Sequence, residues 1–187
     1  ASSGLVHSLS GGIGWIVMLA PLALVFVMGG AFNKLSAMAM MVIFIVYSLL
    51  MGMSLSYIFF FYELGTIAST FFITAGTFGT MAVLGYTTST DLTKFGSILF
   101  MALIGIIIAS VVNFFLGSAQ LDYIISIAGV LIFTGLTAYD VQKIKQIGAS
   151  TEHEGETKQK LVIMGALNLY LDFVNLFLFI LRIFGRD

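Results

Sequence analysis

The sequence predicts an all-α integral membrane protein, and three observations support this prediction. Hydrophobic residues make up 59% of the chain and charged residues only 9%, whereas a soluble domain averages roughly 25% charged residues. The chain contains 20 glycines and 18 phenylalanines, which suits helices that approach closely in lipid. Its apolar residues also fall into long runs. A bilayer core of about 30 Å needs about 20 apolar residues for each crossing.

Six apolar segments are long enough to be membrane spans. They are residues 13–30, 37–61, 66–85, 95–116, 121–140 and 161–184. Short polar breaks at 33–34, 62–65, 87–94 and 117–120 separate the first five segments. The only long polar stretch is 141–160, which is expected to be a solvated loop of mixed charge. Residues 1–187 are therefore expected to form one transmembrane domain, without a soluble domain.

The distribution of charge predicts how the spans are oriented. Strict alternation places on one side the residues Lys34, Lys94, Lys143, Lys145, Lys158 and Lys160. Glu63 and Asp122 fall on the other side, together with residues 1–12. Basic loops remain in the cytoplasm, so the loop 141–160 is expected to be cytoplasmic. Because residues 1–12 then begin outside and lack a signal-peptide pattern, we expect an upstream span, which would make seven in all.

Arg182 complicates the last segment, because a complete crossing places this basic residue outside. The alternative is a re-entrant segment that returns to the cytoplasm. The segment 161–184 is long enough for one crossing and too short for two. A single span is therefore the preferred interpretation.

Asp172 lies in the middle of the last segment, where an ionised carboxylate costs about 2.5–3.5 kcal/mol. Such a residue must face protein or water. Helical spacing places it in one stripe with Gly165, Asn168, Asn175, Phe179 and Arg182. We interpret this stripe as the lining of a central site. The alternative is a polar patch that only joins helices, through hydrogen bonds of about 0.6–2 kcal/mol each.

Asp140 closes the fifth segment. A carboxylate near a helix C-terminus meets the negative end of the helix dipole, at a cost of about 0.3–1 kcal/mol. One reading is a solvated residue paired with Lys143. The other is a carboxylate inside the bundle that faces Asp172, which requires the fifth helix to extend past Lys143 or the sixth to begin before Leu161. Two carboxylates that meet in a low dielectric cannot both ionise cheaply and would titrate as one coupled unit.

The remaining polar residues give weaker signals. Lys34 could reach a carboxylate from the cytoplasmic side, or serve only as a topology signal. Glu63 and Asp122 could attract cations to an outer mouth, or be solvated at the interface. Gly76 and Gly79 are expected to form a small packing face in the third segment. The absence of cysteine excludes disulfides and thiolate metal sites, and a net charge of −1 does not favour a nucleic-acid partner.

Three runs of sequence resemble the transmembrane Bax inhibitor motif family, in particular its bacterial permease-like branch. They are residues 99–105, residues 129–140, which end in Tyr139-Asp140, and residues 169–177, which contain Asp172 and are followed by Arg182. The resemblance covers nearly all of residues 13–187 and implies a seven-helix bundle with a central last helix. It also implies a bacterial inner membrane location and a pH-sensitive calcium leak.

The resemblance further implies roles for individual residues. Asp140 and Asp172 match the aspartate pair that forms the proton sensor of the family. Lys34 is the nearest match to a basic residue that latches the closed state, although lysine lacks the bidentate fork of arginine. Some relatives carry a glutamate in the preceding span, where this chain has Pro21 and no acidic residue. An ion site that needs a third carboxylate is therefore not expected.

The function expected from these features is passive, proton-gated cation flux without a further cofactor, and the resemblance implies that calcium is the transported ion. Asp140 and Asp172, with Asn168 and Asn175, would supply part of the 6–8 oxygens that calcium takes. The expected partners are the lipid bilayer, calcium ions and protons. An alternative is an intramembrane aspartyl protease that uses the same aspartates, although Asp172 lacks a Gly-x-Gly-Asp context. Another alternative is a membrane scaffold without transport, and on balance no enzymatic activity is expected.

Overall fold

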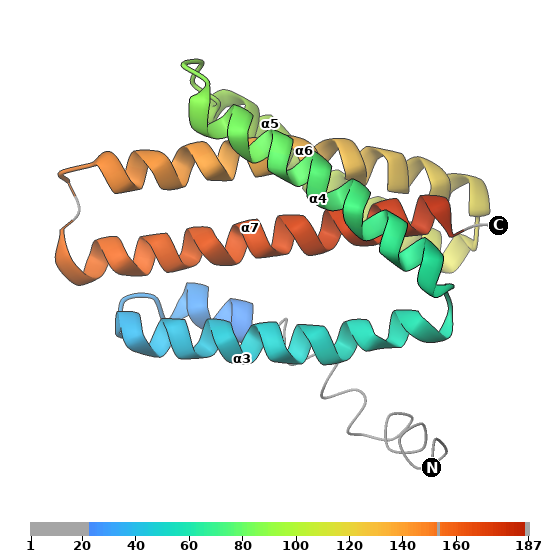
Figure 1. The fold of residues 1–187 in the computed structure, drawn as a ribbon, viewed down its shortest axis with the longest axis horizontal. Coiled ribbons are helices and arrows are strands. Elements are labelled where there is room, and N and C mark those ends of the chain that lie inside the picture. Colours follow the sequence, from blue (N-terminus) through green and yellow to red (C-terminus); the bar gives the residue numbers. More distant parts are fainter. Residues whose placement is uncertain (1–22, 153, 186–187) are drawn as a thin grey trace, which may run out of the picture. The chain divides into compact units, whose positions relative to one another are not determined.

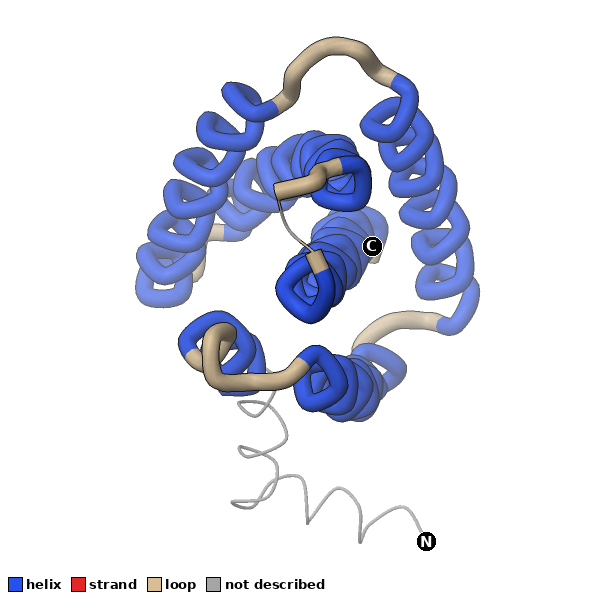
Figure 2. The backbone as a smooth tube through the Cα atoms, turned by 90° about the vertical axis from the view of Figure 1, so that its left-hand side faces the viewer, coloured by secondary structure: helices blue, strands red, loops and turns tan. Residues whose placement is uncertain are grey.

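The computed structural model describes residues 23–152 and 154–185, and all regular structure in this part of the chain is helical (Figure 2). Residues 23–30 form a short helical stretch. The elements that follow are α3 (Ala37–Leu55), the 3₁₀ helix η1 (Ser56–Phe60), α4 (Leu64–Thr87), α5 (Thr93–Leu116), α6 (Ala119–Ala149) and α7 (Gly155–Phe184) (Figure 1).

Five helices in the described residues are long and apolar enough to cross a membrane. These are α3 continued by η1, followed by α4, α5, α6 and α7. They match the predicted spans from 37–61 onward and confirm an all-α membrane protein. Most of the predicted first span, 13–30, lies outside the described residues, as does any upstream span. The seven-helix bundle therefore remains a prediction.

The prediction that residues 141–160 form a loop is wrong, because most of these residues are helical. The helix α6 continues to Ala149 and α7 begins at Gly155, so only residues 150–154 connect them. A span predicted from hydropathy ends where charged residues begin. The helix itself can continue, because lysine, glutamate and glutamine are good helix formers. Their aliphatic stems can also follow the apolar surface while the charged ends reach water. Helix α7 has 30 residues, a length of about 45 Å, and its continuity favours a single span over a re-entrant segment.

The described chain divides into two compact units. The first contains the residues up to Phe61 and the N-terminal part of α7, up to Met164. Here two side chains of α7 cap helix ends near α3. Glu156 Oε1 accepts a hydrogen bond of 2.9 Å from the N–H of Ala37, and Lys160 Nζ donates to the carbonyls of Phe32 and Leu35. An anion therefore lies at a helix N-terminus, where the dipole favours it.

The second unit contains residues 62–151 and the rest of α7 from Gly165. Helix α6 lies beside both α4 and α5 (Figure 1). Gly85 of α4 is packed against the backbone of Ala138, so closely that no Cβ atom would fit between them. Side chains of α5, α6 and α7 form the core of this unit, namely Ile106, Ile132, Phe133, Leu136, Leu176 and Ile180. Close packing on α6 thus positions the C-terminal half of α7.

Polar caps fix the two ends of this second unit. At one end, Gln142 of α6 accepts from the N–H of Leu92 and donates to the carbonyl of Thr90, both at 2.8 Å. Lys145 donates to the carbonyl of Tyr86 at the C-terminus of α4. At the other end, Gly117 terminates α5 with φ 63°, a left-handed conformation that favours glycine. Here Asn113 Oδ1 accepts from the N–H of Ser118. Gln142 and Lys145 therefore join the α4–α5 connection to the C-terminal part of α6, whereas Gly117 and Asn113 belong to the α5–α6 connection.

Candidate functional site

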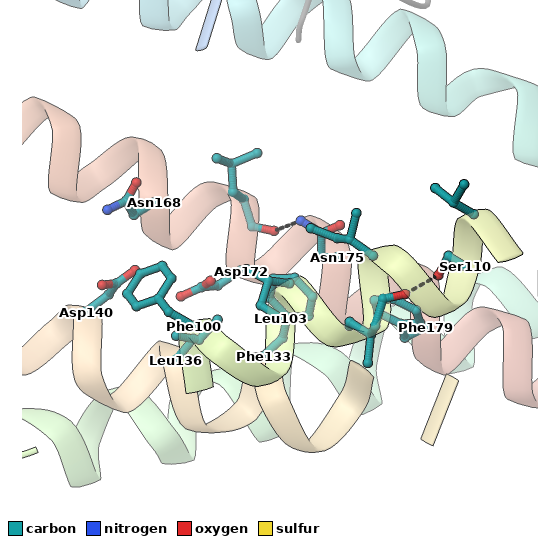
Figure 3. A pocket seen from close by; sticks show the side chains of 14 residues that line it. Phe100, Leu103, Ser110, Phe133, Leu136, Asp140, Asn168, Asp172, Asn175 and Phe179 are labelled. Carbon is teal, nitrogen blue, oxygen red and sulfur yellow. Dashed lines mark hydrogen bonds between the residues drawn. The ribbon is translucent and has the colours of Figure 1, made fainter. Parts of the chain in front are cut away.

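Asp140 of α6 and Asp172 of α7 face the same cavity, with only 4% of each residue exposed. Figure 3 shows both carboxyl groups directed into this space from neighbouring helices. The cavity measures about 450 Å³, and we call it the acidic cavity. It is lined by Phe100, Leu103, Ile106, Ile107, Ser110, Val111, Phe133, Leu136, Asp140, Asn168, Leu171, Asp172, Asn175 and Phe179. All of these residues belong to the second unit.

Helical periodicity explains why these side chains converge. On α6, Phe133, Leu136 and Asp140 are separated by 3 and 4 positions and share one face. Asn168, Asp172, Asn175 and Phe179 follow the same spacing on α7. The facing stripe of α5 is apolar apart from Ser110. The two carboxyl groups thus lie at one cavity surrounded mainly by hydrocarbon.

The two carboxyl groups line the same cavity. They are close enough to repel one another when both are ionised. Asp140 Oδ1 and Asp172 Oδ2 are buried without a hydrogen-bond partner among the described residues. The positive charge of Lys143 attracts the Asp140 carboxylate. Because a buried acceptor without a donor is costly, the pair is suited to hold a proton or a cation.

The residues of the polar stripe predicted on α7 lie in different surroundings. Asn168, Asp172, Asn175 and Phe179 line the acidic cavity. The amide of Asn175 also donates to the carbonyl of Leu171, at 2.8 Å. Gly165 is instead packed against Ile144. The stripe is therefore partly a cavity lining and partly a packing surface.

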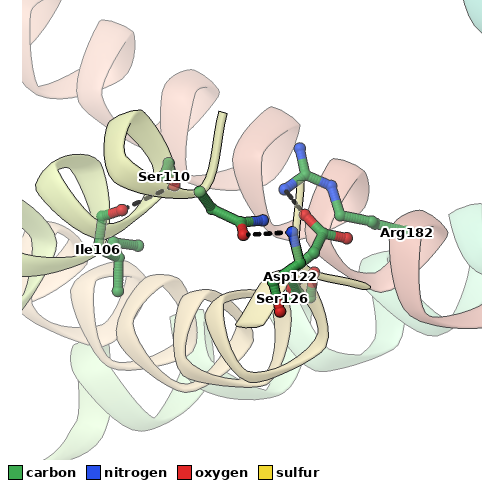
Figure 4. A network of polar contacts seen from close by, with 7 residues as sticks. Ile106, Ser110, Asp122, Ser126 and Arg182 are labelled. Atoms are coloured by element: carbon green, nitrogen blue, oxygen red, sulfur yellow. Dashed lines mark hydrogen bonds and ion pairs between the residues drawn. The ribbon is translucent and has the colours of Figure 1, made fainter. Parts of the chain in front are cut away.

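Arg182 does not line the acidic cavity. Its Nη1 lies 3.2 Å from Asp122 Oδ1, in an ion pair between α7 and the first turn of α6 (Figure 4). The guanidinium also lies over the ring of Phe179, at 5.5 Å from its centre. Asp122 therefore has a basic partner. Glu63, the other predicted outer-mouth acid, is exposed at the N-cap position of α4.

Lys34, the predicted latch residue, is exposed in the turn between the 23–30 helix and α3. It belongs to the first unit, whereas Asp140 belongs to the second. The basic residue whose charge acts on Asp140 is Lys143, one turn further along α6. Lys143 also lies 5.9 Å from the centre of the Tyr139 ring. The latch role of Lys34 stays a prediction.

The sequence analysis missed the contribution of α5 and the role of Gln142. Ser110 is half-buried and its hydroxyl donates to the carbonyl of Ile106. It is a lone polar residue within an apolar run, and that isolation could have drawn attention to α5. Gln142 is buried, although its position beside charged residues suggested a solvated loop. Only the fold reveals that it meets the α4–α5 connection.

The donor set of the acidic cavity contains hard oxygen ligands only. In the part of the chain that the structure describes, no three His, Cys, Asp or Glu side chains cluster as a metal site would require. The cavity offers two carboxyl groups, two amides and the oxygen of Ser110. Carboxylate, amide and hydroxyl oxygens are ligands of the kind that hard cations take.

Comparisons with known proteins agree with the resemblance found in the sequence. The family model described as inhibitor of apoptosis-promoting Bax1 matches residues 1–187. The inner membrane protein YbhL of Escherichia coli (strain K12) is 51% identical over 171 residues, which cover 91% of this chain and 73% of that protein. A protein of Borreliella burgdorferi is 51% identical over 170 residues, covering 91% and 73% respectively. A membrane protein of Streptococcus pyogenes is 42% identical over 166 residues, covering 89% and 71%.

These relatives and the five apolar helices confirm that the chain is a multi-pass membrane protein, and its relatives include an inner membrane protein. The family match extends over the whole chain and therefore includes both helices that carry the aspartates. The chain belongs to the Bax inhibitor family.

Proposed function

We propose that the protein is a passive, proton-gated cation leak, with calcium as the transported ion and Asp140 and Asp172 as the proton sensor. The observation that supports this proposal is the pair of interacting carboxyl groups buried in one cavity of an apolar bundle. Ionisable residues within membrane helices are costly, and they commonly mark ion or proton pathways.

The charge of the pair supplies a route from pH to ion binding. When both carboxyl groups are ionised they repel one another, and a cation between them relieves that repulsion. When the two groups share one proton, they form a charge-assisted hydrogen bond and the pair keeps a single negative charge. The cavity would therefore attract a divalent cation less strongly as protons bind. The hard oxygen donors of the cavity are compatible with calcium, and the choice of calcium itself rests on the family resemblance.

The resemblance adds a latch to this proposal, in which Lys34 restrains the closed state through Asp140. Removal of the cation in Lys34→Ala should raise basal flux by up to about fivefold, since an exposed pair contributes about 0–1 kcal/mol. The measurement is flux through Lys34→Ala, Asp140→Asn and the double variant. Lys143→Met is the comparison variant for Lys34→Ala, because it removes a positive charge that acts on Asp140 from the same helix. If the effects of Lys34→Ala and Asp140→Asn simply add, Lys34 is no latch.

The experiment that tests the function is calcium flux into proteoliposomes that enclose a calcium-sensitive dye, at several pH values. Wild-type protein is expected to pass calcium in a pH-dependent manner. Flux equal to that of empty liposomes at every pH would contradict the proposal. A peptide-cleavage assay on the same vesicles separates the leak from an aspartyl protease, which would cleave peptide and lose that activity in Asp172→Asn.

A further inference from the structure

We propose that the acidic cavity also binds a lipophilic organic cation that enters from the bilayer, such as a hydrophobic quaternary ammonium compound. Its charge would lie at Asp140 and Asp172 and its apolar body along α5. This goes beyond the leak, because such a ligand is an amphiphile bound from lipid, and not the transported ion.

The charge of the cavity favours a cation. Asp140 Oδ1 and Asp172 Oδ2 are buried without a donor among the described residues. Among the residues that the structure describes, the lining contains no lysine, arginine or histidine. Lys143 lies over the Tyr139 ring, outside the lining, and Arg182 is paired with Asp122. The cavity thus holds carboxyl groups that no basic side chain of its own lining neutralises.

The walls favour an apolar body over a bare metal ion. Nine of the fourteen lining residues are apolar. Phe133 and Phe179 stack at a centre-to-centre distance of 5.8 Å, and Phe100 also lines the cavity. Aromatic faces attract quaternary ammonium groups, which have few hydrogen bonds to lose on leaving water. A volume of about 450 Å³ is within the range of small-molecule sites, about 300–1,000 Å³.

The position of the α5 wall provides a route from the membrane. Ile107 and Val111 line the cavity and are nevertheless 54% and 56% exposed. The adjacent Ile104 and Ile108 are exposed as well. The wall of the cavity is therefore continuous with an exposed apolar surface, which on a membrane helix contacts acyl chains. A ligand dissolved in lipid would reach the carboxyl groups along this surface.

The test is equilibrium binding of tritiated phenylbutyltrimethylammonium to the full chain in lipid nanodiscs. We expect saturable binding by the wild type. Affinity should fall at least about tenfold, or about 1.4 kcal/mol, in the double variant Asp140→Asn with Asp172→Asn. Ser110→Phe should also weaken binding because the ring fills the cavity. The control Ile108→Phe adds the same ring at an exposed position outside the lining and should bind like the wild type.

The uncharged tert-butyl analogue, in which carbon replaces the quaternary nitrogen, measures the contribution of charge. It should compete at least about tenfold more weakly than the ammonium compound. The inference is overturned by equal competition from the two compounds, by unchanged affinity in the double aspartate variant, or by the absence of saturable wild-type binding. Elution of each variant as a single species on size exclusion establishes that it is folded. Because binding is measured without flux, a protein that binds the ammonium compound but passes no calcium supports the inference and contradicts the leak.

Discussion

The aspartate pair is a residue-scale arrangement that a membrane protein would not adopt for stability alone. Asp140 and Asp172 interact at close range, and each has a buried oxygen without a partner among the described residues. Buried groups of this kind reduce stability unless a proton or cation joins them. Sites that store such unfavourable interactions are commonly functional.

Asp140→Asn or Asp172→Asn should therefore raise stability, by about 1 kcal/mol for either substitution. The amide cannot ionise, and its N–H groups can donate to the remaining carboxylate. Since repulsion requires both groups to be ionised, the gain should increase with pH and shrink in acid, where a proton already joins the pair. Thermal unfolding in detergent at several pH values measures this effect.

Asp122→Asn provides the matched control, because it weakens an ion pair with Arg182 and should not stabilise the protein. The second aspartate substitution at the cavity should add less than the first, since the repulsion is already removed. Destabilisation by both single variants at every pH would show that the pair is a structural contact and not a strained site.

Much of the cavity could be predicted at the residue scale. The cost of Asp172 in an apolar run and the spacing of Asn168 and Asn175 indicated a shared face. That Arg182 pairs with Asp122 could not be predicted, because the two residues are 60 positions apart. Single-helix periodicity gives the direction of a side chain around its own axis, but not the residue that it meets.

At the scale of elements, the ends of α6 and α7 extend beyond the apolar segments that predicted them. Asp140 and Asp172 were expected to meet only if α6 continued past Lys143 or α7 began before Leu161, and both conditions hold. The charged residues in these extensions cap other helices: Lys145 binds a carbonyl of α4, and Glu156 binds an N–H of α3. Hydropathy located the spans, and helix propensity determined where they end.

The glycines of α4 illustrate a limit of sequence analysis. Gly76 and Gly79 were expected to form the packing face, but a Cβ atom at either position would meet nothing within 4 Å. The close approach is made by Gly85, against Ala138 of α6. Spacing can indicate a face with small residues, but it cannot indicate which face meets a neighbouring helix.

Gly85→Ala should lower stability by about 1–3 kcal/mol, because the added methyl group overlaps the backbone of Ala138. Gly79→Ala makes the same change in open space on the same helix, so it should be neutral or slightly stabilising through helix propensity. Thermal unfolding of the two variants in the same detergent makes the comparison. Equal stability of the two would contradict the α4–α6 packing.

At the scale of the whole molecule, the family and the all-α membrane class could be predicted from sequence, and the comparisons confirm both. The seven-helix bundle, the single-domain organisation and the sidedness remain predictions. The orientation rests on six lysines that alternate to one side, with Glu63 and Asp122 on the other. The ion pair of Asp122 with Arg182 places the C-terminal part of α7 at the same end of the second unit as the start of α6, as a complete crossing requires.

Cysteine labelling tests this orientation, and the chain has no native cysteine to interfere. The variants are Glu63→Cys and Asp91→Cys. Both positions are exposed, one before and one after α4, and they are predicted to lie on opposite sides of the membrane. In intact cells an impermeant maleimide should label the first rapidly, and the second only after the membrane is permeabilised. Equal labelling of both in intact cells would refute the orientation.

The central claim is that the carboxyl pair couples protons to ion flow, and the most direct test is calcium flux through Asp172→Asn as a function of pH. The amide has nearly the shape of the carboxyl group and cannot titrate, so the variant should remain folded while the pH dependence of its flux is abolished or flattened. Glu154→Gln, which neutralises an exposed carboxylate outside the acidic cavity, should retain the wild-type pH profile. A wild-type pH profile in folded Asp172→Asn would contradict the claim.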